Sequence, residues 1–162
     1  MKFHQVIKYI LGHEGGYVFD KADPGGETNF GISKRNHPEY DIKSLTVDNA
    51  KDIYKKYYWK PSKAEQLPNK IAGCYFDMVV NMGQGKAVKI LQKAINASVT
   101  KKIAVDGRIG PQTIEASKKL DLLRLISYRI RYYSDIISKN NTLERFWYGW
   151  FLRALSWKTN VN

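Results

Sequence analysis

One acidic residue stands out in this basic chain: Glu14, which follows an apolar-periodic segment and precedes Gly15 and Gly16. Apolar residues at helical spacing predict a helix over residues 2–13 that the two glycines end, so Glu14 lies at its C-terminal end. A helix C-terminus carries roughly half a negative charge, which disfavours a carboxylate and raises its pKa. A carboxylic acid that stays protonated near neutral pH can serve as a general acid, which is the chemistry that cleavage of a glycosidic bond needs.

A second group for such a reaction follows in a turn-rich segment. In glycosidases, a partner carboxylate about 5–5.5 Å from the acid acts as nucleophile, whereas one about 6.5–9.5 Å away activates water. Asp23 lies nine positions after Glu14, and Thr28, five positions further on, has a hydroxyl that can hold the attacking water. Asp20 and Glu27 are weaker candidates, since strand alternation turns Glu27 away if Thr28 faces the substrate. Ordinary turn and strand roles explain Asp23 and Thr28 equally well.

Strand signals flank this turn, and helical patterns fill the rest of the chain. Residues 17–19 and 28–32 are expected to form the two strands of one small β-hairpin around the Asp-Pro-Gly-Gly turn of residues 23–26. Helices are expected over residues 2–13, from Thr46 to Pro61 with Ile53, Tyr54 and Tyr57 facing inward, from Pro68 to about Gly83, and over residues 87–95, 112–119, 121–139 and 145–157. The predicted fold class is mainly α, or α+β with helices dominant.

Composition bounds the size of the fold and its partners. At 162 residues and 43% hydrophobic content, the chain is long enough for one compact core, or for two small lobes that share it. Its formal net charge of +12 predicts attraction to a polyanion. Nucleic acid, an anionic membrane surface and an anionic cell wall all fit that charge. The single Cys74 excludes an intramolecular disulfide, and its apolar neighbours indicate a buried, unreactive thiol.

The sequence predicts no membrane-spanning helix, no signal peptide and no metal site. No apolar run approaches the roughly 20 residues of a membrane-spanning helix, and the N-terminal segment lacks the apolar core of a signal peptide. We therefore expect no membrane span, and synthesis and folding in the cytoplasm. His4, His13 and His37 suggest a zinc site, but the chain has neither an H-x-x-x-H spacing nor paired cysteines. No metal and no other cofactor is expected.

Several motifs together resemble a known family. The first two are HEGGY, at His13–Tyr17, and DPGGETNFGI, at Asp23–Ile32. The similarity continues through DMVVNMG at 77–83, LQKAI at 91–95, VDGRIGPQT at 105–113 and FWYGWFLR at 146–153. These motifs are similar to glycoside hydrolase family 108, which contains bacterial and phage muramidases, endolysin-like proteins and secretion-associated enzymes. The last two motifs resemble the predicted peptidoglycan-binding module that accompanies the catalytic part of this family.

This resemblance implies a lysozyme-like α+β fold in one compact unit of two lobes. Residues 1–85 would form the catalytic lobe and residues 86–162 the peptidoglycan-binding lobe. The catalytic acid of the family is the glutamate of its E-G-G motif, which corresponds to Glu14. The order of Glu14, Asp23 and Thr28 is also similar to that in phage-type lysozymes, although the interval from Asp23 to Thr28 is one residue shorter here.

Three further residues are assigned to substrate binding. Tyr17 follows the Glu14 segment closely, and its ring can both desolvate the acid and contact a sugar. Asn81 lies four positions after Asp77, so the two side chains share one helix face. The amide of Asn81 offers a donor and an acceptor suited to an acetamido group. The alternatives are that Asn81 is a polar helix-end residue and that Asp77 pairs with a lysine.

The predicted function is hydrolysis of the bond between N-acetylmuramic acid and N-acetylglucosamine, in cell lysis or in protein or toxin release. Inversion, with water held by Asp23 or Thr28, is the interpretation we favour, while retention and 1,6-anhydro formation by Glu14 alone stay open. The expected partners are peptidoglycan glycan strands and a holin-like pore or dedicated release route. Such a route would let a monomeric enzyme act in the periplasm or cell wall.

Two rivals belong to other functional classes. One is a non-catalytic wall-binding or secretion accessory, which has no need of a protonated Glu14. The other is a nucleic-acid binder, since the net charge and the many aromatic residues would suit phosphate and base contacts. Basic residues are spread along the chain and no recognised nucleic-acid motif is found, so no nucleic-acid partner is expected.

Overall fold

The computed structural model describes residues 1–13, 16–19 and 26–159, which divide into two compact units. One unit is Lys2–Pro61, and the other is Ser62–Asn162 together with Met1. Helices dominate and one small antiparallel sheet is present, which confirms the predicted mainly α, α+β fold class. The unit boundary after Pro61 differs from the predicted lobe boundary after Gly85, which stays a prediction.

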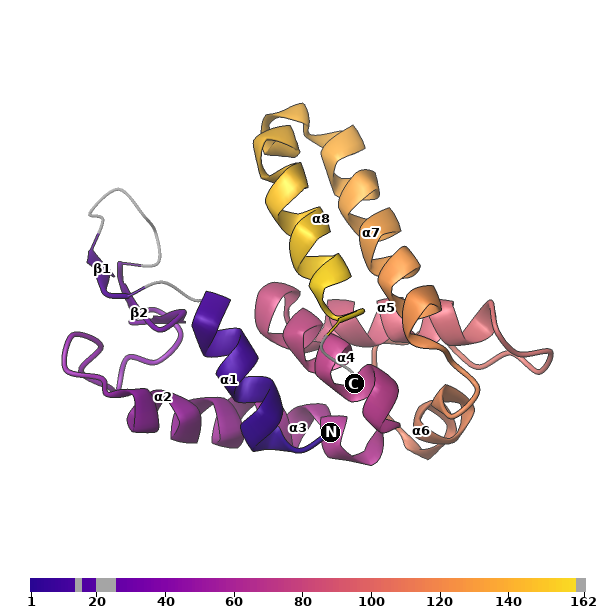
Figure 1. Ribbon diagram of the computed structural model, residues 1–162, viewed down its shortest axis with the longest axis horizontal. Coiled ribbons are helices and arrows are strands. Elements are labelled where there is room, and N and C mark those ends of the chain that lie inside the picture. Colours follow the sequence, from indigo (N-terminus) through magenta and orange to yellow (C-terminus); the bar gives the residue numbers. More distant parts are fainter. Residues whose placement is uncertain (14–15, 20–25, 160–162) are drawn as a thin grey trace. The chain divides into compact units, whose positions relative to one another are not determined.

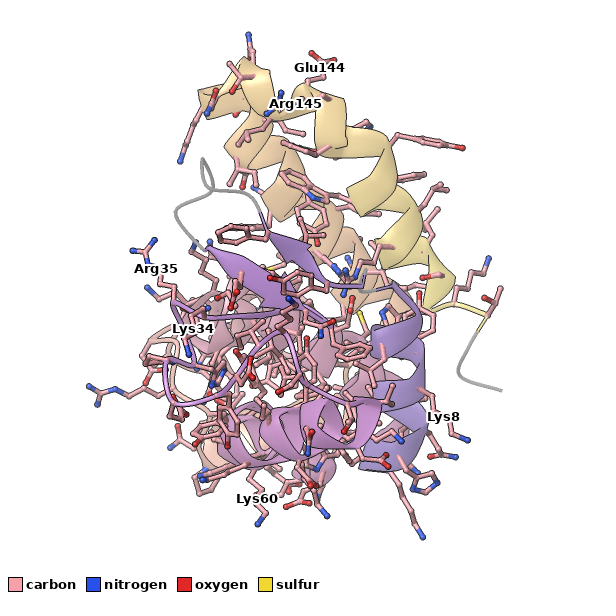
Figure 2. The ribbon with its side chains drawn as sticks, turned by 90° about the vertical axis from the view of Figure 1, so that its left-hand side faces the viewer. Lys8, Lys34, Arg35, Lys60, Glu144 and Arg145 are labelled. Carbon is pink, nitrogen blue, oxygen red and sulfur yellow. The ribbon has the colours of Figure 1, made fainter. Side chains whose placement is uncertain are left out.

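The unit Lys2–Pro61 carries the sheet. Its elements are α1 (Phe3–His13), β1 (Val18–Phe19), β2 (Glu27–Asn29), β3 (Ile32–Ser33), α2 (Val47–Ile53), the π-helix η1 (Tyr54–Trp59) and the start of α3 (Lys60–Ser62) (Figure 1). Helix α1 buries Val6, Ile7 and Ile10, the apolar face predicted from the sequence. Lys8, Lys34 and Arg35 are exposed, and Figure 2 shows them reaching away from this unit.

The sheet has three strands in the order β1-β2-β3, instead of the two predicted. The predicted strand 28–32 is broken because Asn29 pairs with Ile32, which leaves a two-residue turn at Phe30 and Gly31. Both turn residues have positive φ, 51° at Phe30 and 74° at Gly31, as a type I′ hairpin turn requires. A bulky residue rarely adopts this conformation, and Tyr54 Oη stabilises it by donating to the Phe30 carbonyl at 3.0 Å.

Helix α2 begins as predicted and then continues differently. Thr46 Oγ1 accepts from the Asn49 backbone, and Asn49 Oδ1 accepts from the Thr46 backbone, so the cap is reciprocal. After Ile53 the chain changes to the wider π-helix η1. This change rotates the inward face, so that Trp59 is buried and Tyr57 is 37% exposed. The prediction that Tyr57 faces inward is therefore wrong, because it assumed an unbroken α-helical repeat.

All regular elements among the described residues of the unit Ser62–Asn162 are helices. The unit contains η2 (Ala64–Gln66), α4 (Asn69–Met82), α5 (Gln84–Asn96), α6 (Pro111–Ser117), α7 (Leu122–Lys139), the 3-10 helix η3 (Asn141–Phe146) and α8 (Trp147–Ser156). The boundaries of α4 and α7 agree closely with the prediction. The expected helix 145–157 differs, because its first turn belongs to η3, which follows the Asn140 cap.

Helix α4 is the centre of this unit. Every residue from Ile71 to Val79 is buried, and α4 packs against both α5 and α7. Helix α7 also packs along α8, and the two form a helical hairpin whose turn carries Glu144 and Arg145 (Figures 1 and 2). Cys74 is buried on α4, and burial raises the pKa of its thiol to about 11. The predicted burial of Cys74 is therefore confirmed, and the raised pKa favours the neutral thiol over the reactive thiolate.

No helix among the described residues is long and apolar enough to cross a membrane. Helix α7 has 18 residues, five of which are charged, and the other described helices are shorter.

Gly73 is the point at which helix α4 lies close to Trp157. A substitution at Gly73 therefore tests the packing of α4. A Cβ at this position would overlap the buried ring of Trp157 and lie 2.7 Å from Met1 Sδ. Gly73→Ala should therefore lower the free energy of unfolding by about 1–3 kcal/mol through overpacking. Urea-induced unfolding followed by tryptophan fluorescence measures this change.

Gly149→Ala is the matched control, because the same methyl group on α8 meets no atom within 4 Å. It should leave the protein equally stable or more stable by up to about 1 kcal/mol, since alanine is the better helix former. An equal effect of the two substitutions would contradict the packing described for α4.

Candidate active site

Two of the three predicted catalytic residues, Glu14 and Asp23, lie outside the described residues, as does Asp20. The structure therefore describes the elements on either side of them. Helix α1 is described as far as His13, and β1 and β2 flank the segment that contains Asp23. Helix α1 is thus observed to extend to the residue before Glu14, as the proposed effect of the helix end requires.

Thr28, the third predicted catalytic residue, lies on the central strand of the sheet. It pairs with Val18 on β1 and with Ser33 on β3. Its neighbour Asn29 is buried and donates from Nδ2 to the Ile42 carbonyl at 3.1 Å. Because side chains alternate along a strand, Thr28 is on the face opposite Asn29. The Thr28 hydroxyl has no hydrogen-bond partner among the described residues, and its role in the site stays a prediction.

Tyr17 and Glu27 interact directly on neighbouring segments of the sheet. Tyr17 Oη donates to Glu27 Oε1 at 3.1 Å. Partial desolvation and this hydrogen bond to Glu27 raise the pKa of Tyr17. The ring is 40% exposed, and Val18 and Phe19 after it are also exposed, so this edge presents apolar surface to a ligand. The substrate-binding role of Tyr17 stays a prediction, while Glu27 has an observed partner in Tyr17.

His37, one of the three histidines in the zinc hypothesis, is buried in an aromatic cluster. Its Nε2 lies 3.0 Å from Tyr58 Oη, and its Nδ1 lies 3.8 Å from Glu39 Oε1. The Tyr57 ring packs against it edge-on, with a centroid distance of 5.1 Å. These contacts tie the loop after β3 to η1. Within the part of the chain that the structure describes, no group of three or more His, Cys, Asp or Glu is placed to hold a metal ion.

Asp77 lies at the centre of a buried ion cluster. Its side chain has no exposed surface, and Arg129, also fully buried, places Nη1 2.7 Å from Oδ2. Arg153 donates from Nη2 to Oδ1 at 2.8 Å, and Trp157 donates from Nε1 to Oδ2 at 3.2 Å. Burial alone would raise the pKa of Asp77, but the two guanidinium groups outweigh it and hold the pKa below its usual value.

Two arginines therefore take the place of the lysine that the sequence suggested as a partner for Asp77. The Arg129 Nη1 contact is close, yet neither Nη1 nor Nη2 of Arg129 forms a well-aligned hydrogen bond. The attraction between Arg129 and Asp77 is therefore mainly electrostatic. Because both carboxylate oxygens are engaged inside the unit, the observed role of Asp77 is to join α4, α7 and α8. A role in substrate binding stays a prediction.

Asn81 is exposed at the end of α4 and is connected to the ion cluster through Tyr133. Arg129 Nε donates to Tyr133 Oη at 2.9 Å, and Tyr133 Oη lies 3.4 Å from Asn81 Oδ1. An arginine Nε can only donate, so the tyrosine oxygen accepts and its own proton points to Asn81 Oδ1 in a long hydrogen bond. Within the described part of the chain, no acceptor is observed for the amide N–H groups of Asn81, which is exposed.

The sequence analysis did not predict that arginine and aromatic side chains would connect Asp77 to Asn81. One signal was present, since Arg129 lies in the apolar stripe of α7 between Ile126 and Tyr133. A charged residue at a core position of an amphipathic helix indicates a buried ionic partner. No comparable signal marked Arg153, because α8 is aromatic on several faces.

Comparisons with known proteins agree with these observations. The model of the family described as glycosyl hydrolase 108 matches residues 7–83, and that of a predicted peptidoglycan domain matches residues 86–155. The solved structure of Brucella abortus SagA is similar at 27% sequence identity and a TM-score of 0.80, covering 98% of this chain and 92% of that one. A search of curated proteins finds no match. The predicted family and the lysozyme-like fold are confirmed.

Replacing the buried carboxylate tests the ion cluster. Asp77→Asn should lower the free energy of unfolding by about 3–5 kcal/mol at pH 7, because it leaves buried guanidinium groups uncompensated. The folded pKa of Asp77 is lowered, so its contribution is present above the ordinary aspartate pKa of about 3.9 and is lost as the pH falls through the folded value. Wild type should therefore lose more stability than Asp77→Asn between pH 7 and pH 3.

Urea-induced unfolding at several pH values measures both effects. Asp48→Asn is the control, since Asp48 forms an exposed ion pair with Lys51 and its loss should change stability little. Parallel pH profiles for wild type and Asp77→Asn would show that the cluster does not stabilise the folded carboxylate.

Proposed function

We propose that this chain, a peptidoglycan hydrolase that belongs to the glycosyl hydrolase 108 family over residues 7–83, is an N-acetylmuramidase. The bond cleaved would join N-acetylmuramic acid to N-acetylglucosamine. The family match over the segment that contains Glu14 carries this proposal. Peptidoglycan as ligand follows from the predicted peptidoglycan domain over residues 86–155.

Glu14 is the general acid in this proposal. It donates its proton to the bridging oxygen as the sugar develops oxocarbenium character. The C-terminal dipole of α1, a helix described as far as His13, supports a protonated Glu14 near neutral pH. Either Asp23 or Thr28 holds the attacking water, and inversion follows if the two carboxylates are far enough apart to admit it. The Thr28 hydroxyl, for which the described residues offer no hydrogen-bond partner, supports this assignment.

Asn81 recognises the N-acetyl group of the glycan in this proposal. Its amide oxygen faces Tyr133, so its N–H groups can donate to an acetamido carbonyl. Asp77 contributes indirectly, because it fixes Arg129, which in turn orients the Tyr133 hydroxyl.

The charge distribution supports a polyanionic partner. Residues 62–162 contain 17 Lys and Arg against 7 Asp and Glu, whereas residues 2–61 contain 10 against 8. The excess positive charge is therefore concentrated in the unit that contains the predicted peptidoglycan domain. It would draw the enzyme to the anionic cell wall, most strongly at low ionic strength.

The site of action follows from the substrate. We place the enzyme in the periplasm or cell wall after synthesis in the cytoplasm, with passage through a holin-like pore or a dedicated release route, in cell lysis or in protein or toxin release. A monomer is sufficient for this activity. The endolysin-like and secretion-associated members of the family that the sequence resembles support this placement.

Glu14→Gln tests the catalytic assignment. Wild type should release muropeptides with reducing muramic-acid ends from purified sacculi, as identified by mass spectrometry. The variant should release them at least about 100-fold more slowly, because an amide cannot donate the proton at the bridging oxygen. The variant should still sediment with the sacculi as wild type does.

Glu27→Gln, which removes a carboxyl group from β2, is the matched control and should retain most of the activity. Anhydro ends would instead identify a lytic transglycosylase, and freed stem peptides an amidase or peptidase. Normal release of reducing ends by Glu14→Gln would refute the assignment, and wall binding without any release by wild type would indicate a non-catalytic accessory.

Asn81→Asp tests the recognition of the N-acetyl group, because it replaces the donor amide with an acceptor. The preference of the enzyme for N-acetylated over chemically de-N-acetylated glycan should fall by a factor of about 5, which corresponds to about 1 kcal/mol for one hydrogen bond. The ratio of kcat/KM on the two substrates measures this preference. Gln112→Glu, the same change at an exposed amide on α6, should leave the ratio unaltered. An unchanged ratio in Asn81→Asp would remove Asn81 from the site.

A further inference from the structure

A groove of about 410 Å³ lies between α5 and α7 in the unit Ser62–Asn162. Its α7 residues lie three or four positions apart and so share one helix face, and its α5 residues do the same. The two helices pack against each other, which gives the groove a rigid base. The lining residues are Ile90, Lys93 and Asn96 from α5, its C-cap Ala97, Tyr128, Arg131, Tyr132 and Asp135 from α7, and Val105.

Charged side chains of both signs line this groove without hydrogen-bond or ion-pair partners among the described residues. Lys93, Arg131 and Asp135 are exposed. Among the described residues, none of these three side chains has a partner for a hydrogen bond or for an ion pair within 4 Å. Arg131 and Asp135 lie one helical turn apart, a spacing that commonly produces an ion pair, yet they remain separate. The groove therefore offers two cations and one carboxylate to a ligand.

Apolar and aromatic surfaces complete the groove. Ile90 is buried at its base, and Val105 is 39% exposed. The rings of Tyr128 and Tyr132 are partly exposed, and each carries a hydroxyl that can donate to or accept from a ligand. A small apolar base with a few convergent polar groups is the usual construction of a ligand site.

We propose that this groove binds the peptide stem of peptidoglycan, with Lys93 and Arg131 holding a carboxylate and Asp135 holding an ammonium group. N-acetylated sugars carry no charge, so they would leave these three groups unpaired. The amino acids of a wall peptide supply free carboxylates, an ammonium group and small alkyl side chains in one short segment. Arginine is well suited to carboxylates because its guanidinium group can form two parallel hydrogen bonds.

This inference rests on the proposed function, since it assigns the peptide part of peptidoglycan to one groove of the predicted peptidoglycan domain. Neither Asp77 nor Asn81, the residues of this unit that are assigned to the glycan, lines the groove. The positive charge of residues 62–162 favours the same ligand, because wall peptides with free carboxylates are anionic. Glycan cleavage and peptide binding therefore depend on different residues and are separable by experiment.

The test compares two probes: a synthetic stem peptide, and glycan strands freed of peptide by an amidase. Isothermal titration should show saturable binding of the stem peptide to wild type. The double substitution Lys93→Ala with Arg131→Ala should weaken this binding at least tenfold, and Asp135→Asn should weaken it for peptides with a free ammonium group. Binding to peptide-free glycan strands should stay the same in every variant.

The double substitution Arg124→Ala with Lys139→Ala removes the same charge from exposed positions of α7 outside the groove and is the matched control. It should change peptide binding less than twofold. Equal losses in the two double variants would overturn the proposal, because general charge would then explain the binding. Absence of peptide binding to wild type, or preferential saturable binding of a DNA oligonucleotide that needs Lys93 and Arg131, would overturn it as well.

Release of reducing ends from peptide-free glycan strands separates this inference from the proposed function. If wild type binds the stem peptide through the groove but releases no reducing ends, the muramidase assignment fails and the groove assignment stands. If reducing ends are released and the groove variants bind peptide like wild type, the groove assignment fails alone.

Discussion

The unit Ser62–Asn162 depends on one buried carboxylate. Asp77 has no contact with solvent, and a charge in that position is costly unless it is paired. Arg129 and Arg153 supply the pairing, and Trp157 adds a hydrogen bond. These partners come from α7, from α8 and from the turn after α8, so the charge on α4 determines which faces of those helices turn inward. Hydrophobic packing alone would be less selective, since all of these helices carry apolar stripes.

The buried charge of Asp77 also affects a surface residue, Asn81. Arg129 is fixed by Asp77 and directs Tyr133, and Tyr133 directs the Asn81 amide. The buried Asp77 therefore helps to orient the amide of the exposed Asn81, which lies one helical turn away on α4. In the unit Lys2–Pro61 a similar relation exists between Tyr54 and the sheet, because the Tyr54 hydroxyl holds the Phe30 turn that follows Thr28. In each unit, therefore, a tyrosine hydroxyl bonds to a predicted site residue or to the turn next to one.

The sequence predicted most helices because apolar periodicity and end signals agree in α1, α4 and α7. It failed where local rules have exceptions: Phe30 adopts a positive φ that glycine or asparagine usually takes, and η1 departs from the α-helical repeat. For the site, the helix-end position and the family motif indicated Glu14, and the spacing within the turn-rich segment indicated Asp23 and Thr28. These assignments stay predictions. The groove between α5 and α7 was not predictable, because Lys93 and Arg131 are 38 positions apart and only the packing of two helices brings them together.

The ion cluster also crosses the boundary between the two family matches. Asp77 belongs to the region 7–83, whereas Arg129 and Arg153 belong to the region 86–155. A recombination event that joined either region to an unrelated sequence would strand a carboxylate or two guanidinium groups inside apolar surroundings. The two regions are therefore expected to be inherited together, as one evolutionary unit whose halves have lost the freedom to recombine separately.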